Sequence, residues 1–180
     1  APLLEVQVRQ GSRGLPGKPQ AGDRFGHVVA IANLDIGKPD PADDDLARTL
    51  LVGAPGDVVA GHDNAGSVTA IRENLEAAAL YTQNSPGIPG GAETGDRFGT
   101  AISVNIRPTT QVPALLAVGA PGEDAGSIRD AGSVTVLRNS NHTLVNRIGL
   151  TQATRGIAGS AEKGDQFGQD QTDQGQGGGD

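Results

Sequence analysis

The chain has 180 residues, a formal net charge of -7 at pH 7, no cysteine, 28 glycines and 11 prolines. An acidic surface repels phosphate backbones, which argues against a nucleic-acid partner, and the lack of cysteine excludes disulfide bonds and thiolate metal sites. No apolar run approaches the roughly 20 residues of a membrane helix, and the abundance of glycine and proline favours short strands joined by tight turns.

One block of sequence occurs three times without gaps. It begins at a glutamine and ends in Gly-Asp-x-Phe-Gly, and its copies cover residues 10–26, 83–99 and 152–168. A second block begins Gly-Ala-Pro-Gly and ends Ala-Gly-Ser-Val, and it covers residues 53–68 and 119–134. Chance does not produce ungapped copies of this length, so the sequence predicts tandem structural repeats.

Each full repeat is predicted to contain four strands, because apolar and β-branched stretches flank the two blocks. The predicted strands are 25–32, 50–54, 67–71 and 75–82 in the first repeat, and 98–104, 115–120, 133–137 and 144–151 in the second. Residues 73–81 also contain good helix formers, but the equivalence of the repeats favours a strand there. Residues 3–8 occupy the place of the last strand of a preceding repeat.

A four-stranded unit that recurs in tandem is typical of a β-propeller blade. We therefore expect an all-β fold in which residues 1–168 form propeller repeats. Full repeats lie at about residues 22–94 and 95–163, with partial repeats on either side, and residues 169–180 form a disordered Gly/Gln/Asp tail. Propellers typically need about 4–8 blades, so two full blades form an open arc whose apolar faces favour association.

The repeated motifs have a structural explanation at every position. All three phenylalanines of the chain are motif residues, so each is expected to be buried as a wedge between neighbouring blades. The glycine after each one admits a neighbouring backbone, and the proline of Gly-Ala-Pro-Gly ends a strand. The aspartates Asp23, Asp96 and Asp165 are expected to bond local backbone. The structural motif residues are Phe25, Gly26, Gly53, Ala54, Pro55, Phe98, Gly99, Gly119, Ala120, Pro121, Phe167 and Gly168.

Gly-Asp-Arg-Phe-Gly, followed by Val-Gly-Ala-Pro-Gly and Ala-Gly-Ser-Val, resembles the FG-GAP repeat of integrin α-subunit heads and of many secreted bacterial proteins. The resemblance covers about residues 3–168, and the pair of motifs is more specific than either half. It implies a seven-bladed propeller that often binds calcium and serves in adhesion or beside other extracellular modules.

The resemblance also implies a calcium loop between the Phe-Gly strand and the Gly-Ala-Pro strand. In the first repeat this loop offers Asn33, Asp35, Asp43 and Asp45, but an insertion splits the motif and Thr49 holds the place of the closing aspartate. Two interpretations stay open, a weak calcium site or a solvated acidic loop. The corresponding stretch of the second repeat, residues 105–113, has no carboxylate, so no ion is expected there.

Nothing in the sequence predicts catalysis. None of the three histidines, His27, His62 and His142, falls in a repeated motif beside a nucleophile and a carboxylate, and there is no Gly-x-Ser-x-Gly elbow. The expected function is that of an extracellular module that binds a protein or surface ligand or further propeller repeats, with homo-oligomers allowed. The alternatives are a scaffold beside a hydrolase domain in a longer secreted protein, or a self-assembling structural protein.

Overall fold

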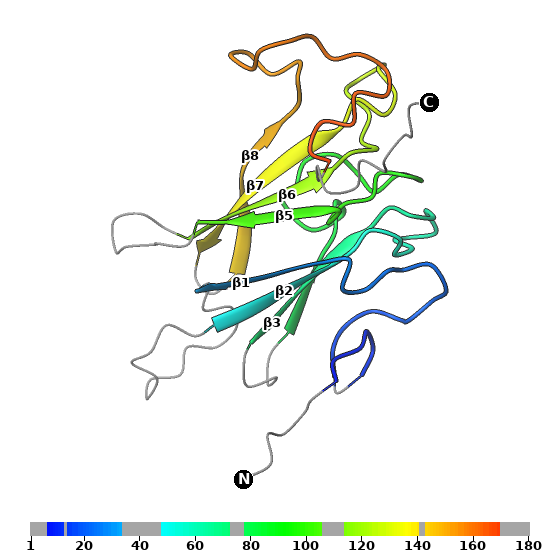
Figure 1. Cartoon of the computed structure of the whole chain (residues 1–180), viewed down its shortest axis with the longest axis vertical. Helices are drawn as coiled ribbons and strands as arrows, with labels where there is room; N and C mark the ends of the chain where they lie inside the picture. The colour runs from blue at the N-terminus through cyan, green and yellow to red at the C-terminus, as the bar shows by residue number, and fades with distance from the viewer. Residues whose placement is uncertain are drawn as a thin grey trace, which may run out of the picture.

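The computed structural model describes residues 7–12, 14–33, 48–72, 78–105, 114–140 and 143–169. These residues form eight strands and no helix, and the strands make two antiparallel four-stranded sheets that pack against each other (Figure 1). The predictions of an all-β fold and of two four-stranded sheets are therefore confirmed. Because the described residues contain no helix, none of them forms a helix that could cross a membrane.

Strands follow one another in each sheet in chain order. The first sheet contains β1 (Val28–Asn33), β2 (Arg48–Ala54), β3 (Ser67–Arg72) and β4 (Ala78–Tyr81). The second contains β5 (Ala101–Val104), β6 (Leu115–Ala120), β7 (Ser133–Ser140) and β8 (Thr143–Leu150). The strand alternative for residues 73–81 is confirmed in its described part, since residues 78–81 pair with β3.

The predicted starts of the first strand in each repeat are wrong, and β7 runs three residues beyond its predicted end at residue 137. β1 and β5 begin three residues after the motif phenylalanines, because the Phe-Gly pairs lie in turns closed by His27 N–H to Arg24 O and Thr100 N–H to Arg97 O, at 2.9 and 3.1 Å. At the other end of the motif, β2 and β6 do stop immediately before Pro55 and Pro121, as predicted.

Most of the predicted strand at residues 3–8, and all of the predicted tail except Gln169, lie outside the described residues. The two residues of the former that are described, Gln7 and Val8, are not in a strand.

Backbone hydrogen bonds lock the second and third Gly-Asp-x-Phe-Gly segments to the repeat before each of them. The N–H groups of Gly95, Arg97 and Phe98 donate to the carbonyls of residues 63, 64 and 65, at 3.0, 2.9 and 2.9 Å. The same pattern recurs one repeat later, where residues 164, 166 and 167 donate to residues 129, 130 and 131, at 3.1, 3.2 and 3.0 Å. The repeats are therefore joined in the same way at both places.

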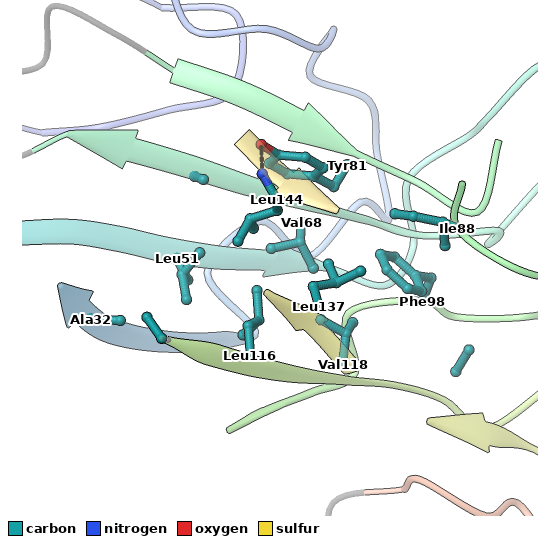
Figure 2. Packing of buried hydrophobic residues seen from close by; sticks show 13 residues of the cluster. Ala32, Leu51, Val68, Tyr81, Ile88, Phe98, Leu116, Val118, Leu137 and Leu144 are labelled. Carbon is teal, nitrogen blue, oxygen red and sulfur yellow. Dashed lines mark hydrogen bonds between the residues drawn. The ribbon is translucent and has the colours of Figure 1, made fainter. Parts of the chain in front are cut away.

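The core lies between the two sheets, where side chains from both point toward one another (Figure 2). Leu51 and Val68 of the first sheet meet Leu116 and Leu137 of the second, and each is essentially inaccessible to solvent. A polar contact also joins the two sheets, since the backbone N–H of Leu144 in β8 donates to the Tyr81 hydroxyl at 3.1 Å. Burial raises the pKa of that hydroxyl.

The expectation that every motif phenylalanine is buried holds only for Phe98. Phe98 is fully buried in the core between the sheets, whereas Phe25 and Phe167 are half-buried. Phe25 packs on one side only, against Val52, Ile71 and Leu15. A phenylalanine of this motif is buried only where a sheet lies on both of its sides, and among the described residues only Phe98 has that surrounding.

Candidate binding site at the loop end of the sheets

Loops 55–66, 82–100 and 121–132 lie at the same end of the two sheets. The strands are antiparallel and adjacent in chain order, so every second connection returns to the same end. In Figure 1 these loops gather on the right-hand side of the view. Side chains from different repeats therefore meet at this end.

A hollow of about 350 Å³ opens between these loops. Two arginines from equivalent positions of consecutive repeats line it, Arg24 and Arg97, each the variable residue of Gly-Asp-x-Phe-Gly. The remaining lining residues are Pro55, Gly56, Asn64, Gly95 and Asp130. The repeat thus places two cationic side chains in one concave surface of an otherwise acidic protein.

The backbone around the hollow is held in an uncommon conformation. Arg24 and Arg97 have left-handed backbones with φ of 55° and 57°, and so do Asn64 and Asp130, at 54° and 52°. Left-handed non-glycine residues are uncommon, and such strain persists only where the surroundings hold it in place. Here the backbone bond from Arg97 N–H to Asn64 O joins two such residues, and both line the hollow.

The aspartate before each variable residue holds the turn, as predicted. The carboxylates of Asp23, Asp96 and Asp165 accept hydrogen bonds from the backbone N–H groups of residues 20, 93 and 162, at 2.5, 2.5 and 2.6 Å. Each bond closes a local turn three residues back along the chain. These aspartates are therefore committed to the backbone and do not reach into the hollow.

Neither arginine of the hollow is neutralised by a carboxylate of the described residues. Arg97 donates from Nε to the carbonyl oxygen of Gly95 at 3.3 Å, and Arg24 is exposed. Asp130 also lines the hollow but forms no ion pair with either guanidinium. A guanidinium presents several N–H groups in a fixed fork that matches a carboxylate, so the hollow suits an anionic group.

A second set of polar residues recurs beneath the loops. Gln10 Nε2 donates to Asp57 Oδ2 at 3.0 Å, and Ser67 Oγ donates to the same oxygen at 2.7 Å. In the next repeat Gln83 Nε2 donates to Glu123 Oε2. The first two of the three block-opening glutamines therefore each bind the carboxylate that follows the next Gly-Ala-Pro-Gly along the chain.

Burial raises the pKa of these carboxyl groups. Desolvation lifts the pKa of Glu123 from 4.5 to about 7, with a further contribution from the charge of Asp96, while the bond from Gln83 opposes the shift. The pKa of Asp96 is raised from 3.8 to about 6, again mainly by burial. Burial also raises the pKa of Asp57. Glu93 and Asp124 add like charge near Asp96 and Glu123.

These shifts predict that the protein loses stability between about pH 4.5 and pH 7. The folded state holds the Glu123 proton more tightly than the unfolded chain does, so its contribution is full below the ordinary pKa and disappears as pH rises toward about 7. After a discount for solvent screening, we expect the free energy of unfolding to fall by about 1–2 kcal/mol across this window. Urea denaturation at a series of pH values measures it.

Glu123→Gln is expected to reduce this slope, most strongly above about pH 6 where Asp96 no longer contributes, because the amide stays neutral at every pH. Glu162→Gln is the matched control, since Glu162 is exposed and changes charge in the same way. An unchanged slope in the Glu123 variant, or an equal loss of slope in the control, would show that the pH dependence arises elsewhere.

The calcium prediction falls largely outside the described residues. Asp35, Asp43 and Asp45 lie between β1 and β2 in residues 34–47, and Asn33 is the last residue of β1. Thr49, at the place of the missing aspartate, is buried in β2. Within the described ranges, no three His, Asp or Glu side chains are grouped so that they could hold a metal ion. A calcium site in the first repeat stays a prediction.

Comparison with known proteins found no family model that matches the chain and no curated protein that is significantly similar to it. The resemblance to the FG-GAP repeat therefore stands on the motifs alone.

The sequence interpretation missed both the arginine pair and the glutamine–carboxylate pairs. A signal for each was present, since arginine occupies the variable motif position in two repeats and an acidic residue follows Gly-Ala-Pro-Gly in both copies. Residues 10 and 57, however, are far apart in the chain, and only the folded sheet brings them within hydrogen-bond distance.

Proposed function

We propose that this chain is an extracellular binding module, an open arc of two β-propeller blades that recognises a carboxylate-bearing protein partner at its loop end and has no catalysis of its own. The tandem four-stranded sheets and the shared backbone ladder support the propeller arrangement. The observation that carries the binding proposal is the pair of unneutralised arginines, Arg24 and Arg97, in one hollow.

The geometry favours a ligand carboxylate for two reasons. The two arginines come from consecutive repeats and their backbones are held in left-handed turns, so little backbone freedom is lost when an anion binds. The rest of the protein is acidic, which repels anions that do not reach the hollow and thereby increases selectivity.

A hexaglutamate peptide is a suitable probe for the hollow. We expect it to shift the side-chain Nε–Hε NMR signals of Arg24 and Arg97, and binding should weaken as salt is added. The double variant Arg24→Gln/Arg97→Gln should lower the affinity at least about tenfold, because it removes charge-assisted hydrogen bonds.

Arg155→Gln is the control for charge, since Arg155 is exposed and lies outside the hollow; it removes one positive charge and is compared with each single variant, Arg24→Gln and Arg97→Gln. Equal weakening in this control would indicate attraction by overall charge alone. Failure of hexaglutamate to perturb either arginine would remove the support for the proposed site.

A further inference from the structure

The first sheet exposes apolar side chains on the face turned away from the second sheet. Val29 and Ile31 of β1 are 60 % and 65 % exposed. Ile31 pairs with the half-buried Leu50 across the sheet, so these residues share one face, which Leu80 of β4 extends. We name Val29, Ile31, Leu50 and Leu80 the open face. Exposed apolar side chains grouped on one sheet face indicate an interaction surface.

The equivalent face of the second sheet is covered. Ile102 and Val104 stand at the same distance after their Phe-Gly pair as Val29 and Ile31 do, and both pack into the core against the first sheet. Inside the chain, the face with Ile102 and Val104 therefore already forms an interface. It packs on the face of the first sheet that carries Leu51 and Val68.

The second sheet presents a face of that partner type. Ala117 and Val134 hold the positions of Leu51 and Val68, and both are half-exposed. A hollow of about 370 Å³ lies on this face, which we name the outer face, and Gly119 and Gly168 also line it. The open face and the outer face thus correspond to the two surfaces that pack together between the sheets of one chain. A second copy of the chain therefore complements the open face.

Residues 164–168 occupy the place on the outer face where part of a second copy would bind. Residues 164, 166 and 167 bond the carbonyls of residues 129–131, and the N–H groups of residues 22, 24 and 25 are their equivalents in the first repeat. Among the described residues, no carbonyl accepts from those three N–H groups. An incoming copy would bring residues 22–26 to the place that residues 164–168 already occupy.

We propose that two copies associate head to tail, with the open face of one on the outer face of the other. In this complex, residues 22–26 of the incoming copy replace residues 164–168 of its partner at the carbonyls of residues 129–131. The interface is heterologous, so each copy keeps one free face of each kind and further copies can add. Residues 164–168 act as a displaceable cap on the outer face.

Two glycines distinguish the cap from the incoming segment. A Cβ at Gly168 would lie 2.4 Å from the carbonyl oxygen of Ser133, whereas a Cβ at Gly26 meets nothing within 4 Å. Their φ angles are nearly the same, +92° and +93°, so alanine strains the backbone equally at both. Gly168→Ala should therefore loosen the cap, while Gly26→Ala should collide only after docking, with Ser133 of the other copy.

Sedimentation velocity of the full chain over a wide concentration range tests the proposal. We expect the wild-type chain to associate with rising concentration, Gly168→Ala to associate at least tenfold more strongly, and Gly26→Ala at least tenfold more weakly. Ile31→Asp should abolish association, whereas Thr94→Asp, on the exposed loop between the two sheets and outside both named faces, should leave it unchanged. Circular dichroism confirms that each variant is folded.

Three outcomes would overturn the proposal. A monomer at every concentration in both the wild-type chain and Gly168→Ala would show that the open face does not bind a second copy. Equal association of the Gly26 and Gly168 variants would exclude exchange of the two segments. Association that survives Ile31→Asp would place the interface elsewhere. Arg24 belongs both to the arginine hollow and to residues 22–26, so the hexaglutamate titration is done at a concentration where the chain is monomeric. Its result is then separate from these three outcomes.

Discussion

Replacement of Phe98 by alanine is expected to lower the free energy of unfolding by about 3–5 kcal/mol, the usual cost of removing a large aromatic side chain from a packed core. Phe98 is fully buried between the two sheets and contributes to the core that joins them. The folded state of a small domain is stable by only about 5–15 kcal/mol, so this loss is a large fraction of the total stability. Urea denaturation followed by circular dichroism measures the effect.

The chain supplies matched controls for this substitution. Phe25→Ala and Phe167→Ala remove the same atoms from the same motif, but both side chains are half-buried. Each should cost about 1–2 kcal/mol, in proportion to the smaller apolar area that it buries. Similar losses in all three variants would contradict the view that only Phe98 is packed from both sides.

Gly99→Ala is the second substitution with a large expected effect. A Cβ at this position would lie 2.5 Å from the Ser67 carbonyl oxygen and 3.0 Å from Val68 Cγ2, and the residue has a φ of +88°. The carbonyl belongs to the backbone at the start of β3, so the two repeats must move apart to admit the methyl group. We expect a loss of about 3 kcal/mol beyond the cost of the left-handed backbone.

Gly26→Ala measures the strain of a left-handed alanine backbone without a steric collision. Gly26 has almost the same φ, +93°, but no atom lies within 4 Å of a Cβ built on it. The thermal or urea stability of this variant, measured at a concentration where the chain is monomeric, should fall by only about 1–2 kcal/mol. A loss as large as that of Gly99→Ala would show that strain alone explains both variants.

Much of the fold could be predicted from the sequence because its signals are local. Alternating and β-branched apolar stretches between glycine-rich blocks predicted eight strands, and the prolines of Gly-Ala-Pro-Gly marked the ends of β2 and β6. The spacing of the copies predicted two four-stranded units in tandem. The bonds of Asp23, Asp96 and Asp165 were also predictable, since each joins residues three apart.

Features that depend on which sheet lies beside which residue could not be predicted in this way. Phe25, Phe98 and Phe167 occupy the same place in the motif, so the sequence predicts the same burial for all three. Packing makes them different, because only Phe98 has a sheet on either side.

The candidate site likewise depends partly on local sequence and partly on packing. The sequence alone determined the repeat, its strands and the turns that hold Arg24 and Arg97. Only the tertiary structure decided that these arginines share one hollow, and that Gln10 and Gln83 reach Asp57 and Glu123. The physical reason is that turns and strand ends depend on neighbouring residues, whereas hollows, buried carboxylates and open sheet faces depend on how distant segments pack.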